Sequence, residues 1–414
     1  MNIALQRMVD RVLGVPICVA LSLVERIFRR PVELAQPRAI LVILLSEMGS
    51  LVLAEPMFTR LKVKYPDARI HALVFVKNRE VLDLLGVIQP ADVHTLDDRS
   101  FWHFLIDGIR VLGRLRSLEL DAVLDCELFS RISSIFSYLS GARVRAGFHP
   151  HTQEGLYRGS FINRPVMYNP YRHITQQLLG MVAALEATSF PRTKEDPVAM
   201  PAGPPLLKLH SGERESTAAA LQAEFPALID RRLVLVYPGG GLLPIRAWPI
   251  DSYAEVCGDL TAAGYVVAVI GQASDGLLAR RLVAQCANGR CIDLTGRTKS
   301  VRQLIALFNC AELLIANDGG PAQFAALAPI ATIALFGPET PLLYRSLSPN
   351  AHYLHLQLPC SPCLTAYNHR CSPCDGDNRC LKQIPPAAVL AKAFELLAAL
   401  GRPVGATRAL GIVA

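Results

Sequence analysis

The sequence is poor in charged residues and contains no low-complexity tract. Only 19% of its 414 residues are Asp, Glu, Lys or Arg, whereas 51% are hydrophobic. Disordered chains combine high charge with few hydrophobic residues, and collagen needs glycine at every third position, so both classes are excluded. A chain of this length exceeds one ordinary hydrophobic core, and we therefore expect two globular domains.

Several catalytic signatures are also missing. Neither Gly-x-Ser-x-Gly nor His-Glu-x-x-His occurs, which leaves serine hydrolase and zinc protease chemistry without support. The dinucleotide fingerprint and the Gly-Lys-Ser/Thr ending of a P-loop are absent as well. The net charge is +7, but the basic residues are scattered along the chain, so nucleic acid is not the expected partner.

Near the N-terminus, an almost wholly apolar stretch is too short for a transmembrane helix. Residues 12–24 fall below the roughly 20 residues that a span needs, and no small-residue cleavage site follows, so a signal peptide also fits poorly. Basic residues flank the stretch on both sides. We expect residues 1–34 to form an amphipathic membrane-associating segment, with these side chains in the acyl boundary: Leu13, Ile17, Leu21 and Val24. The alternative is an arm packed on the second domain.

The chain has eleven cysteines and no clear export signal, which favours a reducing compartment and therefore the cytoplasm, on the inner face of the membrane. Five of these cysteines lie in a Cys-rich loop at residues 359–381. Their paired Cys-x-x-Cys steps suit a tetrahedral thiolate site, so a structural zinc is a candidate, with an iron–sulfur cluster less favoured. The candidate ligands are Cys360, Cys363, Cys371, Cys374 and Cys380.

Continuous apolar strands alternate with helical stretches along most of the chain. Residues 38–45 form such a strand, and a short turn at residues 46–50 leads into a predicted helix to about Lys64. Strands that alternate with helices predict parallel sheets covered on both faces. A proline-rich linker follows at residues 190–205. The pattern predicts an α/β protein with two Rossmann-like, doubly wound domains, 35–190 and 206–400, that face a cleft.

A glycine-rich loop follows the first strand of the second domain. The stretch Tyr237-Pro-Gly-Gly-Gly-Leu-Leu-Pro-Ile-Arg-Ala-Trp-Pro249 places three glycines between a strand and a helix. Such a loop can present backbone N–H groups to a phosphate. The guanidinium of Arg246 adds a positive charge that can donate two parallel hydrogen bonds. A plain glycine turn is the structural alternative.

A second turn of this kind follows a later strand. In Ala316-Asn-Asp-Gly-Gly-Pro-Ala-Gln-Phe-Ala-Ala326, two glycine amides and a helix dipole would face an anion. Asp318 is predicted either to cap that helix or to hydrogen-bond a sugar hydroxyl. Two turns in one domain that can each bind an anion favour a phosphorylated ligand.

These two turns, with Leu335-Phe-Gly-Pro338 and the stretch from Leu44 to Pro56, resemble the heptosyltransferases of glycosyltransferase family nine. The similarity runs from about residue 38 to residue 400. It implies a GT-B fold and metal-independent, inverting transfer of heptose or a similar sugar from a nucleotide-diphosphate donor to a lipopolysaccharide-core or related glycan. It also assigns donor-binding residues in the second domain: Gly239, Gly240, Gly241, Arg246, Asp275, Asp318, Gly319, Gly320 and Gln323.

The sequence departs from the family pattern at three positions, two of them among these donor-binding residues. Arg246 stands for the family's lysine and Gln323 for its histidine, and both keep a hydrogen-bond donor. Ser50 stands for the family's catalytic aspartate, and a serine is no base unaided. Glu47, three residues earlier, and Glu55, expected about one helical turn beyond, are the nearby carboxylates, of which Glu47 is favoured as the general base.

Two other functional classes remain compatible with these motifs. A non-catalytic sugar-nucleotide-binding or assembly protein would keep the fold without the base. A sugar-nucleotide epimerase would use the same two-domain fold to convert the donor without an acceptor.

Overall fold

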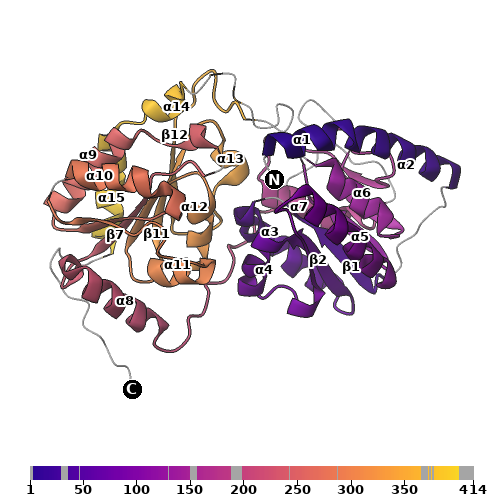
Figure 1. Ribbon diagram of the computed structural model, residues 1–414, viewed down its shortest axis with the longest axis horizontal. Helices are drawn as coiled ribbons and strands as arrows, with labels where there is room; N and C mark the ends of the chain where they lie inside the picture. Colours follow the sequence, from indigo (N-terminus) through magenta and orange to yellow (C-terminus); the bar gives the residue numbers. More distant parts are fainter. Residues whose placement is uncertain are drawn as a thin grey trace. The chain divides into compact units, whose positions relative to one another are not determined.

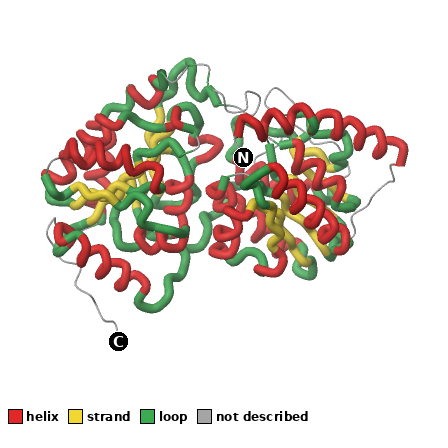
Figure 2. The backbone as a smooth tube through the Cα atoms, in the orientation of Figure 1, coloured by secondary structure: helices red, strands yellow, loops and turns green. Residues whose placement is uncertain are grey.

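The computed structural model describes residues 3–28, 36–45, 47–128, 130–149, 156–187, 198–241, 243–286, 288–364, 372, 374 and 377–400 (Figures 1 and 2). The chain forms two compact units. Met1–Ala202 belong to the first, and Gly203–Cys363 with residues 372–400 belong to the second. Residues 198–212, which include the described part of the predicted linker, contain no helix or strand.

The first unit is built around a six-stranded parallel sheet in the order β3-β2-β1-β4-β5-β6. Every residue of β1 is buried, because helices cover both faces of the sheet. The strands are β1 (Ala39–Ile43), β2 (Arg69–Phe75), β3 (Val93–Leu96), β4 (Ala122–Asp125), β5 (Val144–Phe148) and β6 (Arg164–Val166). The helices are α1 (Ile3–Val12), α2 (Gly14–Phe28), α3 (Met48–Lys64), α4 (Arg79–Leu85), α5 (Phe101–Ser117), α6 (Arg131–Leu139) and α7 (Ile174–Ala184).

The second unit repeats this architecture, with the sheet order β12-β11-β10-β7-β8-β9. The strands are β7 (Leu233–Tyr237), β8 (Val266–Val269), β9 (Cys291–Asp293), β10 (Leu313–Asn317), β11 (Ala331–Phe336) and β12 (Ala351–His355). The helices are α8 (Glu213–Glu224), α9 (Ile250–Ala262), α10 (Gly276–Cys286), α11 (Val301–Phe308), α12 (Gly320–Phe324), α13 (Pro341–Tyr344), α14 (Arg379–Lys382) and α15 (Pro386–Ala399). Both sheets are parallel throughout, which confirms the predicted pair of doubly wound α/β domains.

The N-terminal arm, α1 and α2, lies on the first unit (Figure 1). Both helices contact α6. Cys18 is fully buried against Ile135 and Phe161, and Asp10 forms an ion pair with Arg131 at 2.9 Å. The described helices of the arm therefore pack on the first unit and not, as the alternative had it, on the second domain. In the described part of the chain, no helix combines the length and hydrophobicity that crossing a bilayer requires.

The start of α3 also differs from the prediction. The helix begins at Met48, so the residues up to Ser50 lie in its first turn and not in the preceding loop. Glu47 takes the N-cap position with an extended backbone, and the Ser50 amide donates to the Glu47 carbonyl at 2.9 Å. Because the helix begins earlier, Glu55 lies about two turns into it and not one.

Candidate active site

The glycine loop and the second turn meet at one edge of the second sheet. β7 pairs with β8 on one side and with β10 on the other, so the strand order reverses between β7 and β10. Gly239–Gly241 follow β7, and Asp318–Gly320 follow β10. Ligands of doubly wound sheets bind at the carboxyl ends of the strands, at this point of reversal.

Two glycines of the loop are required by its backbone. A Cβ on Gly240 would lie 2.8 Å from the carbonyl oxygen of Leu243 and from the Cα of Pro244. Gly241 has a φ of +58°, in the left-handed region that other residues rarely adopt. The loop is therefore tightly folded, and the missing side chains leave its backbone open to a phosphate.

Asn317, the last residue of β10, fastens this loop to the sheet. Its amide nitrogen donates to the carbonyls of Pro238 and Gly239, both at 3.0 Å. Its oxygen accepts from the backbone N–H of Trp248 at 3.0 Å and from the hydroxyl of Tyr253 at 3.1 Å. Asn317 is fully buried and fixes both ends of the glycine loop. The sequence analysis missed this residue, although it lies inside the Asn-Asp-Gly-Gly turn.

Arg246 lies between two buried carboxylates. Its Nε is 3.7 Å from Asp318 Oδ2, and its Nη2 is 3.5 Å from Glu339 Oε1. All three side chains are less than a tenth exposed. These distances exceed the 2.7–2.9 Å of directly hydrogen-bonded ion pairs. The site thus joins the loop after β7 with the turns after β10 and β11. Glu339 was missed, although it directly follows the Leu335-Phe-Gly-Pro338 stretch.

The second turn offers less helix dipole than the sequence suggests. α12 has only five residues before a 3-10 turn continues it, and its N-cap residue is Gly319, one position after Asp318. Gln323 is buried and donates through Nε2 to the carbonyl of Tyr344 at 2.7 Å. Its Oε1 has no hydrogen-bond partner among the described residues. The turn therefore offers buried polar side chains beside a short helix end.

Asp275 has a structural role in the loop after β8. Its Oδ2 accepts from the backbone N–H of Gln272 at 2.8 Å and completes a reciprocal capping box. Burial raises the pKa of Tyr237 to about 12, and the negative charge of Asp275 contributes to this shift. Asp275 is therefore near the base of the glycine loop, and its assignment as a donor-binding residue stays a prediction.

The candidate bases are in the first unit, after β1. Glu47 is half-buried at the N-cap position of α3, and its side chain makes no hydrogen bond that caps the helix. Ser50 is half-buried in the first turn. Glu55 is buried further along α3, where its Oε1 accepts from the hydroxyl of Thr59 at 2.6 Å.

A buried ion pair follows the neighbouring strand. Asp125 ends β4, which pairs with β1, and its carboxylate accepts from the fully buried Arg158. Burial raises the pKa of Asp125, whereas Arg158 opposes this shift. Arg158 also donates to the carbonyls of Glu127 and Ser130 and so holds the loop after β4. Sequence analysis did not pair these residues, because 33 positions separate them.

Comparison with known proteins decides the family. Residues 109–370 match the profile of glycosyltransferase family 9 (heptosyltransferase), well over half of the chain. The chain belongs to this family. Family 9 membership makes the protein a glycosyltransferase.

Named members of the family are similar over most of the chain. Lipooligosaccharide heptosyltransferase 2 of Haemophilus ducreyi is 25% identical over 323 residues, covering 77% of this chain and 88% of the relative. Lipopolysaccharide heptosyltransferase 2 of Salmonella typhimurium is 25% identical over 372 residues, covering 87% and 99%. The solved structure of E. coli ADP-heptose lipopolysaccharide heptosyltransferase II has a TM-score of 0.68 at 22% identity, covering 88% of this chain and 100% of that one. This likeness confirms the GT-B fold.

The Cys-rich loop of this family 9 chain is only partly described. Cys371 lies outside the described residues. Ser372 Oγ lies 3.4 Å from Cys363 Sγ and donates to Cys374 Sγ at 3.1 Å. Cys380 is buried, whereas Cys360 is exposed. No three of the described loop thiols lie within 4.8 Å of one another. An open cavity of about 460 Å³ adjoins the loop and is lined by Leu243, Pro244, Ile245, Ser372 and Asn378.

Proposed function

We propose that this glycosyltransferase moves a heptose or similar sugar from a nucleoside-diphosphate donor to a lipopolysaccharide-core type acceptor, with inversion. The observation that carries the proposal is the buried Arg246 beside the glycine loop at the reversal point of the second sheet. A guanidinium and open backbone amides are the groups that bind a diphosphate. The relatives' names support heptose as the sugar and the lipid-linked core as the acceptor.

In the proposed reaction, an acceptor hydroxyl attacks the anomeric carbon of the donor sugar. The new bond joins the acceptor oxygen to that carbon, and the bond to the diphosphate oxygen breaks. Glu47 takes the hydroxyl proton, while Arg246 and the glycine loop stabilise the charge on the departing diphosphate. Direct displacement inverts the anomeric configuration. Catalysis by these residues requires no metal ion.

Donor binding is tested with a thermal-shift panel of nucleoside diphosphates and nucleotide sugars. A ligand at 100 times its dissociation constant stabilises the folded protein by about 2.7 kcal/mol. We expect nucleoside-diphosphate heptoses to raise Tm more than the matching nucleoside monophosphate, which lacks the second phosphate. Equal shifts with the monophosphate and the diphosphate would contradict the assigned role of Arg246.

We further propose that the first unit docks on the cytoplasmic face of the inner membrane, where a lipid-linked acceptor is available. Two helices that both contact α6 expose large apolar side chains. On α2 and the two residues just before it these are Val12, Leu13, Ile17, Val19, Leu23, Val24, Ile27 and Phe28. On α5 they are Phe101, Trp102, Leu105, Ile106 and Ile109. Leu21 instead packs inward against the cluster around Cys18, so its predicted place in the acyl boundary is wrong.

The charges beside these apolar faces fit an anionic lipid surface. Arg11 and Arg26 on the arm are exposed, as are Arg110 and Arg114 on α5. Arginine beside exposed tryptophan and isoleucine is typical of helices that lie in the headgroup region. The eleven cysteines favour the reducing, cytoplasmic side.

A structural metal in the Cys-rich loop stays a proposal. Its candidate ligands are the five loop cysteines, and elemental analysis of protein purified without chelator tests it. Iron belongs in that analysis along with zinc, because the structure of TibC from enterotoxigenic E. coli, described as an iron-containing glycosyltransferase, has a TM-score of 0.51 at 14% identity. If substitution of the loop cysteines removes less than a tenth of an equivalent of metal, this proposal is contradicted.

A further inference from the structure

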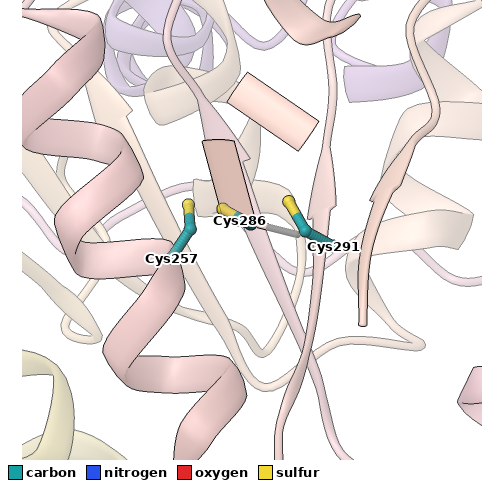
Figure 3. A group of neighbouring side chains, drawn as sticks. All are labelled: Cys257, Cys286 and Cys291. Carbon is teal, nitrogen blue, oxygen red and sulfur yellow. The ribbon is translucent and has the colours of Figure 1, made fainter. Parts of the chain in front are cut away.

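Three cysteines outside the Cys-rich loop come together in the core of the second unit (Figure 3). The Sγ atoms of Cys257, Cys286 and Cys291 all lie within 4.8 Å of one another. Cys257 is in the middle of α9, Cys286 ends α10, and Cys291 begins β9. All three are free thiols and less than a tenth exposed. Their spacing along the sequence, 29 and 5 positions by residue number, gives no metal-binding motif.

The backbone holds these three positions in place. The connection from Cys286 to Cys291 is fastened to α9 at Thr261, one turn beyond Cys257. Asn288 donates to the hydroxyl of Thr261, and Arg290 donates to its carbonyl at 3.0 Å. Thr261 Oγ1 in turn donates to the carbonyl of Cys257 at 2.9 Å. The cluster is therefore fixed by a hydrogen-bonded frame, and its three sulfurs do not depend on a mobile segment to meet.

We propose that Cys257, Cys286 and Cys291 form a structural site for a thiophilic d10 metal ion, Zn²⁺ or Cu⁺. A zinc–sulfur bond of about 2.3 Å places the sulfurs of a tetrahedral site roughly 3.8 Å apart, so small side-chain rotations close the cluster on an ion. Thiolates without carboxylate or imidazole select soft cations over Mg²⁺ or Ca²⁺. The ion also offsets the cost of burying thiolate charge in an apolar core.

The site is separate from the donor site. β9 begins at Cys291, so the cluster lies at the amino end of a strand, whereas the glycine loop follows the carboxyl end of β7. An ion here joins α9, α10 and β9, three elements of the nucleotide-sugar domain. We therefore expect metal to raise the thermal stability of this domain and to leave the transfer reaction largely unchanged.

Elemental analysis of full-length protein tests the site. Reduced wild-type protein is loaded with Zn²⁺, or with Cu⁺ under anaerobic conditions, dialysed, and compared with Cys286→Ser and Cys291→Ser. Each variant should lose about one equivalent of metal relative to wild type. Cys310→Ser, a thiol of the same unit that lies outside the cluster, is the matched control and should lose none. Far-UV circular dichroism verifies that each variant is folded.

A second readout separates a metal site from ordinary core packing. Chelation should lower the Tm of wild type by several degrees but leave the Tm of Cys286→Ser unchanged. Full metal content in both variants, or no binding of either ion by wild type, would overturn the proposal. Metal bound only by the Cys-rich loop would be lost in Cys360→Ser and retained in Cys286→Ser, which also contradicts the site.

Discussion

Arg246 is the residue on which donor binding depends most directly. Its guanidinium is buried between Asp318 and Glu339, with Nε 3.7 Å from Asp318 Oδ2 and Nη2 3.5 Å from Glu339 Oε1. A diphosphate in this place would receive a planar pair of N–H donors. Lysine carries the same charge but cannot reproduce the bidentate geometry.

We expect Arg246→Gln to weaken donor affinity by roughly 10–100-fold, because a hydrogen bond to a charged group contributes about 1.5–3 kcal/mol. Arg246→Lys should fall between wild type and Arg246→Gln. Isothermal titration with the nucleoside diphosphate measures both. Arg281→Gln, at an exposed position of the same unit, is the control and should bind normally. Wild-type affinity in Arg246→Gln would disprove the assignment.

Glu47 is proposed as the base because it lies half-buried at the start of α3, close after β1, whereas Glu55 is buried further along the helix and bonded to Thr59. Loss of a general base typically costs 10²–10⁴-fold in rate. Glu47→Gln should therefore lower kcat by about that factor and leave donor affinity unchanged. Glu55→Gln is the matched comparison and should retain most activity. The reverse ranking of the two variants would assign the base to Glu55.

His71 and His94 form a buried pair beside Asp92 in the first unit. The Nδ1 of His71 has two neighbours at 3.4 Å. One is His94 Nε2 and the other is Asp92 Oδ1. The pKa of His94 is lowered to about 4, chiefly by burial and also by the charges of His71, Arg114 and Arg69, against the opposing charge of Asp92. An unfolded histidine titrates near 6.5, so between pH 6.5 and 4 the unfolded state binds more protons.

The free energy of unfolding should therefore fall as the pH drops through this window. From pH 7 to pH 5 we expect His94 to account for a loss of roughly 1–2 kcal/mol. Urea unfolding at both pH values measures this loss, and His94→Gln should reduce it. His210→Gln, at an exposed histidine, should show the wild-type pH dependence. An equal loss in His94→Gln and wild type would rule out this source.

At the scale of helices, the apolar faces of α2 and α5 predict membrane binding. Burial of a large apolar side chain contributes roughly 1.5–3 kcal/mol, so two charged substitutions should lower partitioning more than 10-fold. We expect Leu23→Glu with Ile27→Glu on α2, and Trp102→Glu with Ile109→Glu on α5, to reduce sedimentation with anionic liposomes. These exposed positions avoid the buried contacts of Cys18 that a deletion of the arm would remove.

Leu277→Glu is the matched control, because Leu277 is an exposed leucine on α10 of the second unit. It should leave liposome binding unchanged. Binding that is insensitive to both pairs of substitutions, or wild-type protein that stays in the supernatant, would contradict docking by these faces.

Elements with strong local patterns could be predicted from the sequence, whereas short or partly exposed ones could not. β1 and β7 are continuous apolar runs, buried at every position, and their predicted locations agree with the structure. β9 has only three residues, and β12 is partly exposed along its length, so neither has a distinct pattern. The prediction that the loop extends to Ser50 was wrong. Glu47 occupies the N-cap without a side-chain cap, so no capping signature in the sequence marks the start of the helix.

The donor site could likewise be predicted only where its residues lie close together in the sequence. The glycines and Arg246 lie within one contiguous stretch, so their chemistry is visible in the sequence. The roles of Asn317, Glu339 and the Cys257 cluster depend on contacts between different strands and helices, which only the fold supplies.

At the scale of the whole molecule, the two units share one strand order, and each carries a different part of the proposed site. The groups proposed to bind the donor diphosphate are in the second unit, and the candidate bases are in the first. Transfer therefore needs both units, and a variant impaired in one should keep the function assigned to the other. Glu47→Gln should still bind donor, and Arg246→Gln should still bind acceptor.

The central claim, that the chain is an inverting heptosyltransferase despite Ser50, is tested most directly by the product of wild-type protein. Purified protein is incubated with a nucleoside-diphosphate heptose and a lipopolysaccharide-core acceptor, and NMR gives the configuration of the new glycosidic bond. The account predicts a product whose anomeric configuration is opposite to that of the donor. A product with the donor's configuration, or hydrolysis of the donor without transfer, would contradict it.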